Sequence, residues 1–267
     1  MTRLLRAELF KLRTTPGPWI CIGVTMLLTG LGITTAFIVA NHHGSAHFAA
    51  PTTSGELRDL VGAGYEAGVV MAPVLGVICI STEYRHKVLT ATLLLSPRRP
   101  QVIAAKVAAS VVWGLSMAVA SFVMVAAMGI PLLIAEGGSV SAMVHQVEPV
   151  VPGILAAYAL LAVYGLGLGT LVRNQVAGVI LALGITLVLE PIIVAIFSSL
   201  VHVDVNFLPS RATQAVAGGL VTHRTGTATS AVSEVLLTPW LGGLVLLGWG
   251  VASALIGYYV SFRRDVT

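Results

Sequence analysis

Charged residues are scarce in this sequence. Only 10% of its 267 residues are charged, whereas 56% are hydrophobic. A soluble domain carries about a quarter charged residues, and a core of this length does not hide so much apolar surface from water. The shortage of charge therefore excludes an ordinary soluble domain and indicates a membrane protein.

Cysteines are few, and the common catalytic motifs are missing. Cys21 and Cys79 both fall in apolar segments, so we expect small buried side chains rather than a disulfide or a metal pair. The sequence contains no GxxxxGK[ST] phosphate loop, no HExxH and no GxSxG. We therefore expect that the chain is not an enzyme by itself, with no catalytic residues and no metal or cofactor of its own.

What the sequence does contain is a series of apolar segments of about 20 residues, the length that crosses a bilayer as a helix. We expect an all-α polytopic membrane protein whose 267 residues form a single transmembrane domain. The expected spans are approximately 19–40, 64–81, 107–134, 151–172, 176–200 and 239–262. The polar stretches 41–62, 135–150 and 201–238 are expected to be loops, the first with a short helix around Glu56–Leu60.

The distribution of basic residues predicts the orientation. Of the 15 lysines and arginines, all but Arg58, Arg211 and Arg224 lie on the side of the N-terminus, the 83–106 segment, the 173–175 turn and the C-terminus. We therefore expect a multi-pass protein of the cell membrane with both termini in the cytoplasm. Because the basic residues sit in short loops between spans, the net charge of +4 does not indicate nucleic-acid binding.

The first 16 residues, MTRLLRAELFKLRTTP, combine leucines at helical spacing with Arg3, Arg6, Lys11 and Arg13. This pattern predicts an amphipathic helix at the membrane surface, with its basic residues near anionic headgroups.

The segment 83–106, EYRHKVLTATLLLSPRRPQVIAAK, is the longest polar interruption on the basic side. Its leucines and valine suit a short helix in the interface plane that ends at Pro97, where the chain turns back toward the bilayer. Such an element is able to transmit a push from a cytoplasmic partner to spans 2 and 3. The alternative is a basic loop that only fixes the orientation.

These two segments resemble known proteins. The stretch 83–106 is similar to the segment after the second span in type 2 ABC transporter permeases of the exporter type, especially small six-span actinobacterial subunits, and LLRAELFKLRTTPGPW resembles their opening. In that family the N-terminal helix and the first cytoplasmic loop form much of the contact with a separate ATPase. The matching positions, implied to couple to the ATPase, are Glu8, Lys11, Arg13, Glu83, Tyr84, Arg85, His86, Thr92, Leu93, Pro97, Arg98, Arg99 and Lys106.

The resemblance also implies partners. A cytoplasmic ABC ATPase, in two copies, would hold the ATP and Mg, and a second permease subunit would complete a homodimer or heterodimer in the lipid bilayer. Other interpretations are a secondary transporter or channel that uses the intramembrane acid Glu190, and a non-transporting docking or assembly subunit. The spans, built from Ala, Val, Leu and Gly, do not specify a substrate.

A few residues within or beside the spans are candidate sites. Glu190 and Pro191 interrupt the fifth span; an acid there suits a substrate path, or a re-entrant break near the outer surface. The pairs Gly64/Gly68 and Gly165/Gly169 have GxxxG spacing, which permits close helix approach. The histidines His42, His43 and His47 stand together, but without neighbouring Cys or carboxylate at metal-binding spacing we expect a solvated loop. Glu66 is expected near the outer end of span 2.

Overall fold

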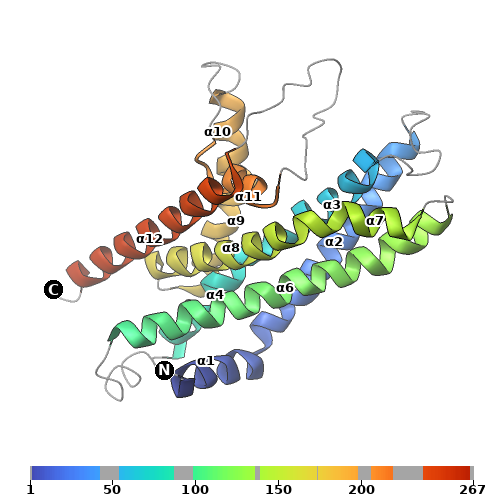
Figure 1. Ribbon diagram of the computed structural model, residues 1–267. Coiled ribbons are helices and arrows are strands. Elements are labelled where there is room, and N and C mark those ends of the chain that lie inside the picture. Colours follow the sequence, from blue (N-terminus) through green and yellow to red (C-terminus); the bar gives the residue numbers. More distant parts are fainter. Residues whose placement is uncertain are drawn as a thin grey trace.

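The computed structural model describes residues 2–42, 54–86, 99–135, 139–172, 174–197, 206–218 and 237–264. All secondary structure within these ranges is helical (Figure 1). In order, the first helices are α1 (Thr2–Thr14), α2 (Pro16–His42), α3 (Ser54–Val69), α4 (Met71–His86), α6 (Arg99–Ala135) and α7 (Val140–Val147). They are followed by the 3₁₀ turn η1 (Glu148–Val150), α8 (Val151–Leu171), α9 (Gln175–Gly184), the π-helical turn η2 (Ile185–Leu189), α10 (Glu190–Ile196), α11 (Pro209–Val216) and α12 (Pro239–Arg264).

Six helical segments in the described ranges are long and apolar enough to cross a bilayer. They run over Pro16–Ile38, Val61–Thr82, Gln101–Ala135, Met143–Leu171, Gln175–Ile196 and Pro239–Gly257. The all-helical class and the number of membrane-crossing segments expected from hydropathy are therefore confirmed.

The helices extend further into polar sequence than hydropathy predicts. Helix α6 begins at Arg99, so Lys106, expected in the loop before span 3, lies two turns inside a helix. The 135–150 loop expectation is wrong for its described part, because Val140–Val147 and Glu148–Val150 are helical. Hydropathy locates only the apolar part of a helix, and polar residues can continue it beyond the hydrocarbon.

The second span is made of two helices, α3 and α4, which meet at residue 70. Pro73 explains the interruption, because a proline has no N–H to donate to the carbonyl four residues earlier, at Val69. The short interface helix expected over residues 88–95 lies outside the described residues.

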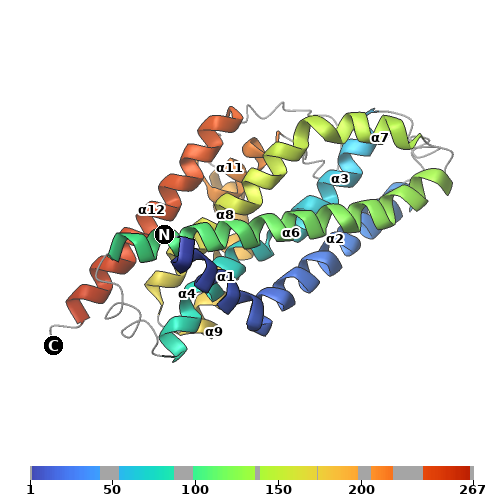
Figure 2. The ribbon, with the colours of Figure 1, turned by 60° about the horizontal axis from the view of Figure 1, so that its bottom comes forward.

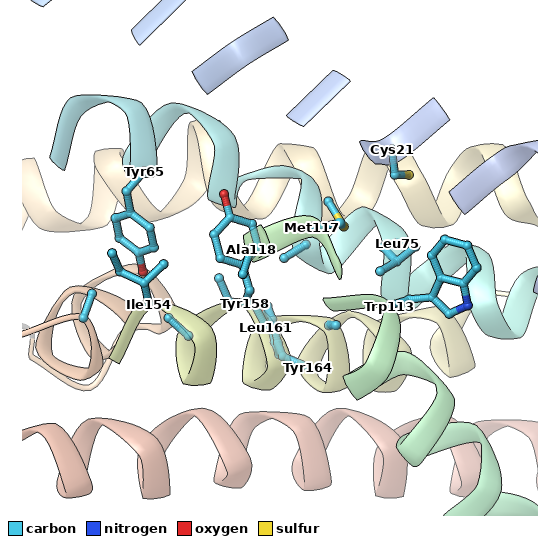
Figure 3. Packing of buried hydrophobic residues seen from close by; sticks show 14 of the residues in the cluster. Cys21, Tyr65, Leu75, Trp113, Met117, Ala118, Ile154, Tyr158, Leu161 and Tyr164 are labelled. Carbon is cyan, nitrogen blue, oxygen red and sulfur yellow. The ribbon is translucent and has the colours of Figure 1, made fainter. Parts of the chain in front are cut away.

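Helix α8 occupies the centre of the bundle, with α4 and α12 packed along it (Figures 1 and 2). Its Tyr158 and Tyr164 are among the largest fully buried side chains. Figure 3 shows Tyr158 beside Tyr65 of α3, and the two rings meet edge to face at 6.0 Å between centroids. Leu75 of α4 and Met117 of α6 complete this core from the neighbouring helices.

The fifth span stands apart from the core. In Figure 1 the stack of α9, η2 and α10 rises steeply away from the other spans. Only 11% of the apolar stretch of this span is buried, whereas 61% is buried in the span that contains α8. Most of its apolar side chains, such as Ile180, Leu187 and Ile192, are exposed and suited to lipid. Glu190, by contrast, is only 2% exposed, and Gly178 and Ala182 are also buried.

Candidate functional site

Helix α1 packs against the protein with one face. Leu5, Leu9 and Leu12 recur at helical spacing, Leu12 is only 3% exposed, and the other two pack against the same buried cluster. The helix lies beside the first turns of α6 and near the start of α2 (Figure 2). The apolar face of α1 is thus covered by the bundle.

A buried ion pair fastens α1 to α6. Lys106 Nζ donates to Glu8 Oε2 over 3.3 Å, with side chains that are 6% and 13% exposed. Lys11 Nζ, from the next turn of α1, lies 3.8 Å from the same oxygen and is more exposed, at 28%. A charge removed from water is stable only when an opposite charge or hydrogen bonds compensate it. The pair therefore fixes the position of α1 along α6.

The connection between α1 and α2 is held at the same place. The Trp19 indole N–H donates to the Arg13 carbonyl over 2.9 Å. The Trp19 ring also meets Trp113 of α6 edge to face, with 5.5 Å between centroids. These contacts hold the bend at Thr15 and attach it to the third span.

A second face of α1, next to the leucine face, is open. Arg6, Phe10 and Arg13 follow one another at three- and four-residue spacing, and all three are exposed, Phe10 to 68%. We call these three residues the α1 stripe. An exposed aromatic ring between two arginines on a helix beside the bundle is a surface suited to a partner.

The other residues expected to couple to an ATPase divide into two groups. Glu83, Tyr84, Arg85 and His86 form the last turn of α4, and Arg99 begins α6. Thr92, Leu93, Pro97 and Arg98 lie outside the described residues. The end of α4, the start of α6 and helix α1 gather at one end of the bundle, which also holds the end of α12 (Figures 1 and 2). We call this the α1 end.

Glu190 contacts a helix that hydropathy does not predict. Its Oε2 accepts the Ser210 backbone N–H over 2.7 Å, at the first turn of α11. Its Oε1 is buried and has no hydrogen-bond partner among the described residues. Pro191 lies beside it on the exposed side of α10. The acid thus faces the short helix α11, and the π-helical turn directly before it is a distortion common at functional positions.

The two GxxxG pairs lie where helices approach closely. A Cβ built at Gly64 would lie 3.1 Å from Ile33 Cγ1, and one at Gly68 would meet Thr29 Oγ1 and lie 2.8 Å from the Tyr158 hydroxyl. At Gly165 and Gly169 an added Cβ would run into α4. Beside Gly68, the buried hydroxyls of Thr29 and Ser121 are hydrogen bonded at 3.1 Å. This link between α2 and α6 has no sequence signature beyond the polar residues themselves.

Metal-binding groups do not gather in the part of the chain that the structure describes: it contains no cluster of three or more His, Cys, Asp or Glu residues. His42 ends α2, and His43 and His47 lie outside the described residues. Cys21 and Cys79 are buried free thiols. Glu66 is half-buried and accepts a hydrogen bond from Gln214 of α11 over 3.0 Å.

Comparison with protein families agrees with this architecture. A family described as "ABC-2 family transporter protein" matches residues 4–190, from α1 to Glu190. No curated protein matches the sequence. Permeases of this family lack ATPase activity, bind no cofactor themselves and generally pair with an ABC ATPase. The chain therefore belongs to the ABC-2 transporter family and is a multi-pass membrane permease.

Proposed function

We propose that this permease is the membrane subunit of an ATP-driven exporter and that its α1 end receives the ATPase. The proposal places both termini and the 83–106 segment in the cytoplasm of a cell-membrane protein. The concentration of lysine and arginine at this end supports that orientation, because cytoplasmic loops carry the excess of basic residues.

The Glu8–Lys106 pair is the observation that carries the proposal. A partner that binds the exposed side of α1 exerts force on α6 as well. The reason is that the Glu8–Lys106 pair and the packing of Leu5, Leu9 and Leu12 prevent α1 from sliding along the bundle. Glu8 and Lys106 would then act as the link between the docking surface and the third span. The ATPase itself would contact Lys11 and the α1 stripe, which includes Arg13.

The end of α4 and the start of α6 would provide the second contact. Glu83, Tyr84, Arg85, His86 and Arg99 flank residues 87–98, which include Thr92, Leu93, Pro97 and Arg98. A force on residues 87–98 reaches spans 2 and 3 together, because this segment connects α4 of span 2 to α6 of span 3. Two ATPase copies and a second permease, the same chain or a related one, would complete the exporter, since six spans are few for a translocation path.

The alternative of a secondary transporter driven through Glu190 has less support. A coupling acid is expected to face a wet path and to exchange ions or protons. Glu190 is instead buried and accepts a backbone hydrogen bond from α11. An acid in this position is better suited to holding a helix.

Charge exchange across the Glu8–Lys106 pair tests the proposal. The permease is co-expressed with the ATPase that co-purifies with it, and ATP hydrolysis by the complex is measured in lipid nanodiscs. Glu8→Lys and Lys106→Glu each place two like charges together, so we expect each to reduce hydrolysis at least about tenfold. The double exchange restores the attraction and should recover most of the activity.

Glu148→Lys is the control, because it reverses an exposed acid on η1. We expect it to leave hydrolysis unchanged. A double exchange that is no more active than either single variant would contradict the proposed link. A permease that binds no ATPase in any lipid or detergent would contradict the proposed function as a whole.

A further inference from the structure

Helix α11 is a short helix with most of its surface covered. Five of its eight residues are buried: Pro209, Ala212, Thr213, Ala215 and Val216. Its sequence, PSRATQAV, is too polar and too short to cross a bilayer, and hydropathy assigns it to the soluble 201–238 stretch. The structure instead inserts it against α12 and α8, beside α3 and α10 (Figure 1).

Two glycines on neighbouring spans make room for the α11 backbone. A Cβ built at Gly153 of α8 would run into the Val216 carbonyl oxygen. A Cβ at Gly242 of α12 would lie 2.7 Å from the Ala212 carbonyl oxygen, which is closer than real Cβ atoms approach. The fit of α11 therefore depends on the absence of side chains at two positions in other spans.

Two acids on different spans hold the two ends of α11. Glu190 of the fifth span accepts the Ser210 N–H over 2.7 Å, in the first turn. Glu66 of the second span accepts from the Gln214 side chain over 3.0 Å, in the last turn. We call these four residues, Glu66, Glu190, Ser210 and Gln214, the acid clasp. It connects α11 to parts of the bundle that are far apart in the sequence.

Glu190 supplies what the start of α11 lacks. The first N–H groups of any helix have no acceptor within the helix. Leu208 stands at the N-cap and offers no side-chain acceptor, while Pro209 removes one of the orphan donors by having no N–H. The Ser210 N–H is among the first-turn donors that remain, and within an apolar bundle an unsatisfied N–H is costly. Glu190 thus replaces the missing cap, because its carboxyl oxygen accepts the N–H that an N-cap side chain would otherwise accept.

We propose that Glu66 and Glu190 are positioning residues that hold α11 as a gate helix. In the resting state the acid clasp keeps α11 inserted between the spans, at the end where α8 and α12 begin. Release of Ser210 from Glu190 frees α11 and opens that end during transport. The step of release rests on the proposed exporter function, whereas the attachment of α11 does not.

Amide exchange at Ser210 measures the attachment directly. The permease is labelled with ¹⁵N-serine and ¹⁵N-tryptophan, placed in lipid nanodiscs without an ATPase, and followed by NMR as the labelled N–H protons exchange with deuterium. Glu190→Met keeps the volume of the side chain but removes the acceptor, whereas Glu190→Gln retains an acceptor oxygen. A role in packing alone predicts that Met and Gln behave alike.

We expect Glu190→Met to accelerate exchange at Ser210 by about tenfold or more, because the Ser210 N–H loses its acceptor. Glu190→Gln should stay within about threefold of the wild type, since the amide oxygen remains an acceptor for the Ser210 N–H. Equal exchange in the wild type and in Glu190→Met would overturn the proposal. So would a Glu190→Gln variant that exchanges as fast as Glu190→Met.

Two indole signals serve as internal references. The Trp249 N–H donates to the Phe207 carbonyl over 2.8 Å, directly before α11, and the Trp19 N–H donates to Arg13 at the α1 end. Glu190→Met should accelerate exchange at Trp249 and leave Trp19 unchanged. If Glu190→Met does not fold, Gln214→Met removes the bond to Glu66 from the α11 side, and the same pattern is expected with a smaller factor. Unchanged Ser210 and Trp249 signals in that variant would overturn the proposal.

The release step needs the ATPase. In the complex, ATP with vanadate should accelerate exchange at Ser210 relative to the nucleotide-free complex, and an unchanged rate would overturn the gate. If no ATPase binds the permease, the proposed function fails, while the Glu190→Met and Glu190→Gln comparison still decides whether the clasp exists.

Discussion

The α1 end and the α11 region each have a short helix attached to the spans through a buried acid, but the attachments differ in kind. At the α1 end, Glu8 belongs to the short helix and its partner is a lysine side chain on a span. In the α11 region, Glu190 belongs to a span and its partner is a backbone N–H of the short helix. The first attachment can be rebuilt with exchanged charges, whereas the second requires only an acceptor.

The faces that remain open differ as well. Helix α1 keeps the α1 stripe exposed, with Phe10 at 68%, while α11 has five of eight residues buried. A helix with one covered and one open face is suited to carry a partner's force into the bundle. A helix covered on most sides is suited to fill space and to move only when its neighbours separate. The four predictions that follow use this contrast.

The largest effect is expected from Glu8→Ala. The substitution removes the carboxylate that pairs with the Lys106 ammonium, which is 6% exposed, and removing one partner of a buried ion pair destabilises by about 3 kcal/mol. The free energy of unfolding, measured by SDS titration in mixed micelles, should fall accordingly. The double variant Glu8→Ala/Lys106→Met removes both charges and should recover most of the loss. A double variant as unstable as Glu8→Ala would show that packing, rather than charge, attaches α1.

Gly242→Ala should have the next largest effect and should act at α11. The added methyl group meets the Ala212 carbonyl, and overpacking of this kind costs about 1–3 kcal/mol. Gly248→Ala, on the same helix, is the matched control, because a Cβ there meets nothing within 4 Å. Thermal unfolding in nanodiscs should separate the two variants. If both leave the midpoint unchanged, α11 does not depend on close approach to α12.

A smaller effect on stability is expected for the hydrogen bond between α2 and α6, because it joins two neutral hydroxyls and no charged group. Thr29 and Ser121 join α2 to α6 over 3.1 Å. A double-mutant cycle with Thr29→Ala and Ser121→Ala should give a coupling energy of about 0.6 kcal/mol, the average for such pairs in membranes. A coupling as large as that of the Glu8–Lys106 pair would erase the distinction between charged and neutral attachment.

The smallest effect on stability is expected at the α1 stripe. Arg6→Ala and Arg13→Ala change exposed side chains, so the free energy of unfolding should stay within about 0.5 kcal/mol of the wild type. Retention of the ATPase during purification should nevertheless fall, because the partner loses cationic contacts. Arg13→Lys keeps the charge and should retain more ATPase than Arg13→Ala. Full retention in both alanine variants would place the partner elsewhere.

The sequence predicts the regular parts of this fold better than the attachments. Span number follows from hydropathy because each segment carries its own signal over about 20 residues. The leucine spacing of α1 likewise predicts its helix and its covered face, although the structure places protein, rather than lipid, against Leu12. The sequence predicts a loop position for Lys106, because its partner, Glu8, is 98 positions away and no residue close to Lys106 in the sequence indicates the pair.

Helix α11 could not be predicted from the sequence for a different reason. Its small and polar residues are typical of a loop, and its burial depends on glycines at 153 and 242 on other helices. The position of Glu190 within an apolar segment indicates a constrained acid, and a re-entrant break was one of the two expectations. Its partner is a backbone N–H, which every residue except proline offers, so no residue type identifies Ser210 in advance.

Three glycines in the second half of α8, at positions 165, 167 and 169, carry one more consequence. Gly165 and Gly169 bring its backbone against α4, while Gly167 brings it against Gly250 of α12 on another side. Main-chain atoms in such contact cannot reorient as side chains do, so α4, α8 and α12 should travel as one rigid layer. Any rearrangement of the permease would then be a shear along the borders of that layer. The fifth span would move most easily, because it is the least buried of the six.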